Sequence, residues 1–99
     1  MFKELNPLLH SELRLGIMSI LLSVEEADFV FIREKTGATA GNISVQTEKL
    51  SEVGYIEVQK GFAEKRTRTV YNITKKGVDA FEEYVKALKS YLDINRQRI

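Results

Sequence analysis

The binding of an anion is the first chemistry that this sequence suggests, because its basic side chains are concentrated in one short segment. Residues 60–69 read KGFAEKRTRT, and four of these ten residues are basic. Residues 57–76 carry a net charge of +4, whereas residues 1–56 carry −3 and residues 77–99 are balanced. The whole chain has a formal net charge of only +1, so the excess is local. The segment is therefore either a solvated loop or an anion-binding surface.

Other kinds of chemistry have little support in the sequence. The 99 residues include no Cys, which excludes disulfides, thiolate metal sites and cysteine nucleophiles. There is one His, at position 10, and neither a glycine-rich phosphate loop nor a carboxylate pair in a catalytic setting. We therefore expect no enzymatic activity, no metal and no cofactor.

The length and composition predict one domain, residues 1–99, in the cytoplasm. A hydrophobic share of 43% and a charged share of 29% are typical of a soluble protein with one modest core. No apolar stretch is long enough to cross a membrane, and the first ten residues lack the pattern of a signal peptide. The absence of Cys also suits a reducing compartment.

Capping residues and apolar periodicity predict two helices in the first third of the chain. The first ends near Ser23 and begins at one of two caps, either Asn6, which Pro7 follows, or Ser11. The second is short, begins after Asp28 and ends at Gly37, a residue suited to a left-handed C-terminal cap.

A third helix is predicted from Thr39, as its cap, to about Val53. Its inner face is expected to contain Ile43, Gln46, Thr47, Leu50 and Val53. Its outer face contains Gly41, Ser44, Val45, Glu48 and Glu52, with Asn42 and Lys49 on the flank. The first two turns of the outer face are therefore small and uncharged. On the inner face, we expect the Thr47 hydroxyl to bond back to a carbonyl of its own helix.

The basic segment falls at the tip of a predicted β-hairpin. Residues 55–60 alternate between apolar and polar side chains, and residues 68–73 are rich in β-branched and aromatic ones, so both are predicted to be strands. Residues 61–67, with Gly61 at the turn, are expected to form the tip. The alternation of a strand would place Arg66 and Arg68 on the same face.

A long last helix is predicted after Thr74, its cap, and it ends near residue 95. Apolar residues recur in it at spacings of three and four: Val78, Phe81, Val85, Leu88, Tyr91 and Leu92. This is more apolar surface than one small core should bury, which favours a dimerisation helix. In the alternative, the helix folds back on the first helix of its own chain.

The order of these elements is that of a winged helix-turn-helix domain, a mostly helical α+β fold. It consists of three helices, a two-stranded wing and a long C-terminal helix. We assign residues 6–23 to the first helix, 28–54 to the helix-turn-helix, 55–73 to the wing and 74–95 to the last helix.

Several short motifs in this order resemble a family of small prokaryotic winged-helix regulators related to the MarR and ArsR groups. The motifs are Asp28-Phe29, Lys35-Thr36-Gly37, residues 41–45 (GNISV), Lys49-Leu50, Gly54-Tyr55-Ile56, Lys60-Gly61-Phe62, Arg68-Thr69 and Thr74-Lys75-Lys76-Gly77. The resemblance covers about residues 8–92. It implies a homodimeric, DNA-binding transcriptional regulator whose third helix enters the major groove.

Two departures from the family pattern stand out. Gln46 and Thr47 lie where relatives commonly have His and Leu, and Val30 and Phe31 are more apolar than the short second helix usually needs. The second departure suggests an additional contact surface.

A DNA-binding role assigns chemistry to two sets of residues. In the third helix these are Thr39 and Ala40 at the phosphate-binding N-terminus, Gly41 at a close approach, Asn42, Ser44, Val45 and Gln46 toward the bases, and Lys49 on a phosphate. In the wing they are Lys60, Lys65, Arg66 and Arg68, which would neutralise phosphates or enter the minor groove. Packing is a simpler role for Gln46, and plain tolerance is an equal explanation for Gly41.

The expected partners are double-stranded DNA and a second copy of the chain, held through the first and last helices. The alternative function is a winged-helix module that binds proteins without specific DNA binding, which the near-neutral total charge favours. The sequence is compatible with a small-molecule effector but identifies none.

Overall fold

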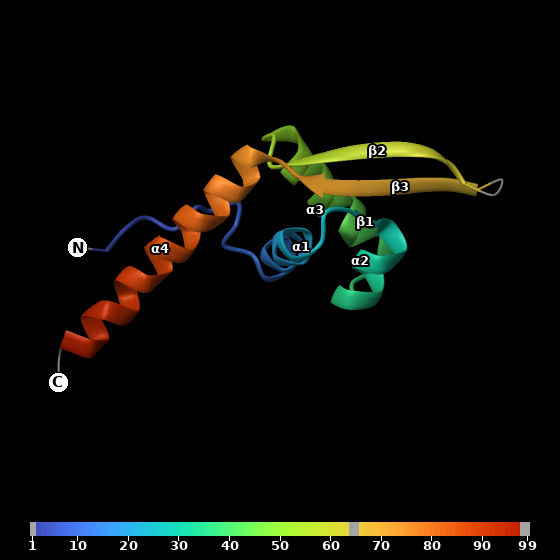
Figure 1. Cartoon of the computed structure of the whole chain (residues 1–99). Coiled ribbons are helices and arrows are strands. Elements are labelled where there is room, and N and C mark those ends of the chain that lie inside the picture. The colour runs from blue at the N-terminus through green and yellow to red at the C-terminus, as the bar shows by residue number, and fades with distance from the viewer. Residues whose placement is uncertain (1, 64–65, 98–99) are drawn as a thin grey trace.

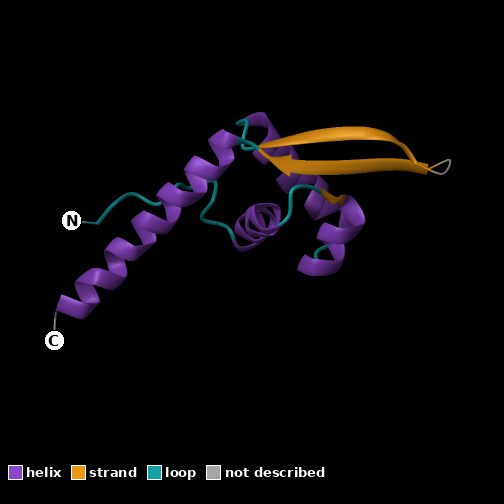
Figure 2. Cartoon of the chain, viewed as in Figure 1, coloured by secondary structure: helices purple, strands orange, loops and turns teal. Residues whose placement is uncertain are grey.

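The computed structural model describes residues 2–63 and 66–97, with side-chain surroundings for residues 2–61 and 67–92 (Figure 1). The elements follow one another as α1 (Glu12–Ser23), β1 (Ala27–Asp28), α2 (Phe29–Thr36), α3 (Ala40–Glu52), β2 (Ile56–Ala63), β3 (Arg66–Ile73) and α4 (Lys75–Gln97). This is the predicted winged helix fold. The β2–β3 hairpin and α4 extend from the helical body in opposite directions (Figure 2).

Of the two predicted starts of the first helix, the one at Ser11 is correct. The Ser11 side chain accepts a hydrogen bond from the backbone N–H of Arg14, and α1 begins at Glu12. Asn6 instead closes a separate turn, in which its Oδ1 accepts from the N–H of Leu8 at 2.9 Å. The assignment of residues 6–11 to the first helix is therefore wrong, because the extended backbone of Ser11 separates this turn from α1.

The caps predicted for the other helices are confirmed. Asp28 caps α2 by accepting from the N–H of Phe31 at 2.8 Å, and Gly37 ends that helix with a left-handed φ of 70°. Thr39 caps α3 by accepting from the N–H of Asn42 at 3.2 Å. Thr74 does the same for α4, since its Oγ1 accepts from the N–H of Gly77 at 3.0 Å.

The wing belongs to a three-stranded antiparallel sheet with the strand order β1-β3-β2. β1 pairs with β3 at Ala27 opposite Tyr71, and two residues are too few to show a strand pattern in the sequence. β2 and β3 pair without interruption from Ile56 opposite Ile73 to Ala63 opposite Arg66. The expected hairpin tip at residues 61–67 is therefore wrong. Antiparallel pairing continues through residues 61–63, 66 and 67, so Gly61 lies within a strand, opposite Arg68.

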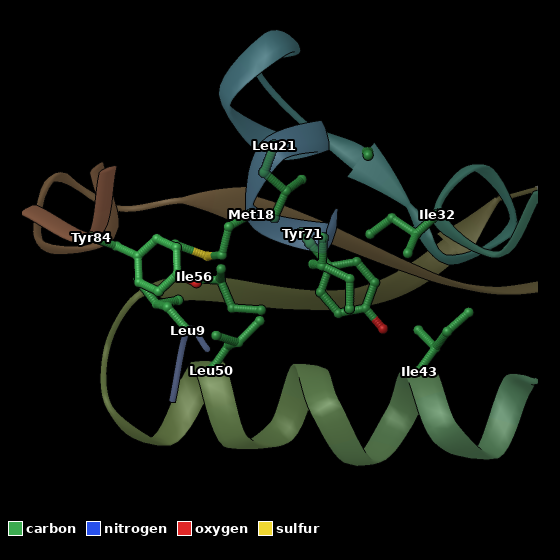
Figure 3. Close-up of a cluster of buried hydrophobic side chains, with 11 residues drawn as sticks. Leu9, Met18, Leu21, Ile32, Ile43, Leu50, Ile56, Tyr71 and Tyr84 are labelled. Carbon is green, nitrogen blue, oxygen red and sulfur yellow. The ribbon is translucent and has the colours of Figure 1, made fainter. Parts of the chain in front are cut away.

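The core lies between α1, α3 and the sheet, as Figure 3 shows. Its fully buried members include Leu9, Ile17, Met18, Leu21, Ile32, Ile43, Leu50 and Ile56. On the inner face of α3, Thr47 is buried and its Oγ1 donates to the Ile43 carbonyl at 2.8 Å, as predicted. Val53 does not belong to this face, because it lies at the C-terminal cap and is 37% exposed.

The start of α4 is pressed against the turn between α3 and β2. The N–H of Thr74 donates to the Tyr55 carbonyl at 3.0 Å, and its hydroxyl donates to the Gly54 carbonyl at 2.6 Å. A Cβ atom added to Gly77 would lie 2.1 Å from that same Tyr55 oxygen. Glycine is therefore required at position 77 by close packing.

Candidate nucleic-acid interface

The outer face of α3 is exposed as the sequence predicts. Gly41, Asn42, Ser44, Glu48 and Lys49 are all exposed, and Val45 is 48% exposed. The N-terminal half of this face contains small, polar and apolar groups without charge, and the acidic groups of Glu48 and Glu52 follow in the C-terminal half. An anionic polymer would therefore approach the N-terminal half.

The N-terminus of α3 offers backbone donors. The Thr39 side chain accepts a hydrogen bond from the N–H of Asn42. The first backbone hydrogen bond of the helix runs from the N–H of Ile43 to the Thr39 carbonyl. The N–H groups of the first turn at Ala40 and Gly41 point out of the helix end, where they suit phosphate oxygens. A Cβ on Gly41 would meet nothing within 4 Å, so packing within this chain gives no reason for a glycine there.

Gln46 lies half-buried between α3 and α1. Its Oε1 accepts a hydrogen bond from Nη1 of Arg14, and its Nε2 donates to Oδ1 of Asn42 at 2.9 Å. This position agrees with the packing role that the sequence left open for Gln46. The part played by Arg14 was not predicted, because it depends on a contact between residues 32 positions apart.

The two described basic residues of the wing lie at different distances from the helical body. Lys60 is exposed on β2, opposite Thr69 of β3. Arg68 lies nearer the helical body, where Nη2 and Nε donate to Oδ2 of Asp28 at 3.3 and 3.4 Å. The other carboxylate oxygen of Asp28 caps α2, so one side chain joins the wing to the start of that helix. Lys65 and the side chain of Arg66 lie outside the described residues.

A groove of about 990 Å³ separates the wing from α2 and α3. Its charged lining residues are Asp28, Glu48, Glu52, Lys60 and Arg68. Val30, which the sequence marked as unusually apolar, is 60% exposed and lines the same groove. Phe31 instead packs against the core, and the ammonium of Lys35 lies 5.4 Å from the centre of its ring.

Helix α4 has two apolar stripes. One packs on the chain's own core through Gly77, Tyr84 and Ala87, all of which are buried. The predicted stripe is the other one: Val78, Phe81 and Val85 are half-buried, Leu88 is 43% exposed and Leu92 is 53% exposed.

Tyr91 does not continue the exposed stripe of α4. Its ring stacks on Phe2 with the ring centroids 4.5 Å apart, so it holds the N-terminal segment of its own chain. Helix α4 therefore packs on its own chain along one face, and on the other face Phe81 also contacts the core, whereas Leu88 and Leu92 remain exposed.

Two further observations concern the described part of the chain, residues 2–63 and 66–97. No helix there combines the length and the apolar character needed to span a membrane. No group of three acidic or His side chains there is gathered closely enough to hold a metal ion.

Comparison with known proteins identifies the family. Residues 13–92 match the family of winged helix DNA-binding domains, and the chain belongs to this family. The predicted fold and the predicted resemblance to prokaryotic winged-helix regulators are thereby confirmed.

Individual relatives agree with the family assignment. An uncharacterised protein of Methanocaldococcus jannaschii, MJ0432, is 34% identical over 76 residues, which are 77% of this chain and 83% of that protein. The structure of a transcriptional regulator homologue from Pyrococcus horikoshii OT3 is similar with a TM-score of 0.80 and 32% identity, over 87% of this chain and 85% of that one. A mutant of MarR from E. coli shares the fold with a TM-score of 0.73 at 15% identity, over 88% of this chain and 63% of that one.

Proposed function

We propose that this protein is a transcriptional regulator that binds specific sites in double-stranded DNA as a homodimer. The observation that carries the proposal is the outer face of α3, whose N-terminal half is exposed, uncharged and headed by a capped helix end. Such a face fits the major groove, where donors, acceptors and thymine methyl groups distinguish the bases. The family assignment and the regulator homologue from Pyrococcus horikoshii support this function.

In this arrangement the two parts of the site have different tasks. Ser44 and Val45 would contact base edges, whereas Lys49, the backbone N–H groups of Ala40 and Gly41, and the wing would contact phosphates. Phosphate contacts give affinity and register without sequence information, and base contacts give specificity. Replacing Ser44 or Val45 should therefore change the preferred sequence more than the affinity for random DNA.

The test is selection of bound fragments from a pool of randomised duplex DNA, followed by titration of the selected duplex by fluorescence anisotropy. We expect one enriched motif, tighter binding to that motif than to random duplex, and weaker binding of both duplexes as salt rises. A protein that binds neither duplex at low salt would contradict the proposal and favour the protein-interaction module.

The homodimer is proposed to form through the exposed stripe of α4, together with α1. Leu88 and Leu92 present apolar side chains to solvent on a long helix, and a second copy would bury them. A two-fold dimer would place two α3 helices about 34 Å apart, one turn of DNA, so selected sites should be palindromic.

Sedimentation equilibrium tests the dimer directly. The double variant Leu88→Glu, Leu92→Glu should sediment as a monomer, because two carboxylates would have to be desolvated in the interface. The variant Val53→Glu adds a charge at an apolar position that is similarly exposed but lies beside the start of α4, away from Leu88 and Leu92, and it should stay dimeric. A wild-type protein that is monomeric at all accessible concentrations would rule out this part of the proposal.

A further inference from the structure

Three side chains from α1 and α3 form one continuous hydrogen-bonded chain that ends on the DNA-facing side of α3. Arg14 of α1 donates through Nε to the carbonyl of Leu8, in the turn that precedes α1, and through Nη1 to Oε1 of Gln46. Gln46 donates through Nε2 to Oδ1 of Asn42 at 2.9 Å. Asn42 is exposed, whereas Arg14 and Gln46 are half-buried.

The chemistry of arginine fixes the direction of this chain. A guanidinium group has five N–H donors and no acceptor, so the Gln46 amide must turn its oxygen toward Arg14. Its nitrogen then faces Asn42, and Asn42 must turn its own oxygen toward Gln46. A reversed Gln46 amide would oppose two donors at Arg14 and two oxygens at Asn42, so both hydrogen bonds would be lost. A reversed Asn42 amide would oppose its nitrogen to that of Gln46, so the bond between these two residues would be lost. The free end of the chain is therefore the Nδ2 amide of Asn42, which is a donor.

We infer that Asn42 reads the major groove as a hydrogen-bond donor, with a preference for guanine, and that Arg14 and Gln46 are positioning residues that set this preference without touching DNA. The inference rests on the proposed function, since it requires α3 to lie in the major groove. Guanine presents two neighbouring acceptors there, O6 and N7, whereas cytosine presents a donor. The bidentate contact of Asn with adenine needs its oxygen and its nitrogen together, and the Asn42 oxygen is engaged by Gln46.

The variant Gln46→Glu reverses the direction of the chain with almost no change in shape. A carboxylate has only acceptors, so Glu at position 46 can still pair with Arg14 but must accept from the Nδ2 amide of Asn42. The Asn42 oxygen would then face outward as an acceptor. We expect the preferred base to change from guanine to cytosine or adenine, which carry an exocyclic amine. The ratio of the affinity for guanine to the affinity for these bases should fall by about tenfold.

The experiment first selects binding sites with the wild-type protein and locates the base pair at which Asn42→Ala loses discrimination. The relative affinities for the four bases at that position are then measured for Gln46→Glu. Gln59→Glu is the charge-matched control, because it adds the same charge at an exposed position on β2 and should keep the guanine preference. Arg14→Lys, which removes the rigid guanidinium donor, should weaken the preference without reversing it.

A measurement without DNA checks the orientation itself. In NMR spectra of the free proteins, the side-chain amide protons of Asn42 should shift downfield in Gln46→Glu relative to wild type, because they then donate to a carboxylate. Unchanged Asn42 amide signals, or a retained guanine preference in Gln46→Glu, would overturn the inference while leaving DNA binding intact. A wild-type protein that binds no duplex at all would instead refute the proposed function, and the inference with it.

Discussion

Gly41 is a residue at which stability and function should respond in opposite directions. Alanine at this helical position should raise the free energy of unfolding by up to about 1 kcal/mol, because it restricts the unfolded chain and the space for its Cβ is open. If the DNA backbone approaches Gly41 as proposed, the same methyl group should lower the affinity for duplex.

The Gly41→Ala prediction is checked by urea unfolding together with anisotropy titration. Gly16→Ala is the matched control, since a Cβ on Gly16 in α1 also meets nothing within 4 Å. That variant should gain stability and bind as wild type does. Equal affinity of Gly41→Ala and wild type would show that DNA does not come close at Gly41.

Tyr71 should make the fold sensitive to alkaline pH. Burial raises the pKa of its hydroxyl above the ordinary value of 10.0. The folded state therefore holds the proton more tightly than the unfolded state does. The resulting stability is fully present below about pH 10 and is lost as the pH rises from there toward the folded-state pKa.

The measurement for Tyr71 is urea unfolding at several pH values below and above 10.0. Tyr71→Phe keeps the buried ring and removes the titrating group, so its stability should fall less steeply above that pH than that of wild type. Parallel curves for the two proteins would exclude Tyr71 as the titrating group.

At the scale of elements, we expect Asp28 to restrain the wing through its ion pair with Arg68 and thereby to lower the affinity for DNA. The amide oxygen introduced by Asp28→Asn can still cap α2, but the ion pair with Arg68 is lost. Because that pair is partly exposed, we expect the variant to lose less than about 1 kcal/mol in stability. Arg68 would then be free for a phosphate. The variant should bind duplex more tightly than wild type and with a steeper salt dependence.

Anisotropy titrations at several salt concentrations test this prediction. Asp79→Asn is the control, because it removes the same charge and breaks the exposed pair with Lys75 on α4. It should change the affinity much less than Asp28→Asn does. Weaker binding of Asp28→Asn would mean that the ion pair holds Arg68 in position for DNA.

The helices could be predicted from the sequence because their signals are local. Each cap acts within three residues, as Ser11, Asp28, Thr39 and Thr74 show, and the α3 periodicity identified its buried and exposed faces apart from Val53 at the end. The features that were missed depend on contacts between distant residues. β1 exists because Ala27 and Asp28 meet β3, and the wing is longer than expected because the two strands continue to pair.

The candidate site divides in the same way. Its exposed residues on α3 were predicted, since exposure follows from periodicity. The ion pair of Arg68 and the contact of Arg14 with Gln46 were not predicted, because they join residues 40 and 32 positions apart. Spacing along one element cannot indicate which distant side chain will satisfy a charge.

At the scale of the whole molecule, phosphate binding should depend on where a charge lies rather than on the net charge. If Lys60 on the wing contacts one phosphate, Lys60→Gln should reduce the magnitude of the slope of log affinity against log salt by about 0.9. Lys89→Gln removes the same charge from the exposed surface of α4 and should leave the slope nearly unchanged. Equal slopes for the two variants would show that the wing makes no phosphate contact through Lys60.

The close contact at Gly77 couples the ends of the molecule. Because the first turn of α4 rests on the Tyr55 carbonyl, α4 cannot tilt without moving the turn that joins α3 to β2. In the proposed dimer, the crossing angle of the two α4 helices would therefore determine the separation of the two α3 helices. Any molecule that altered this crossing angle would change the half-site spacing that the dimer fits, without contacting a DNA-facing side chain.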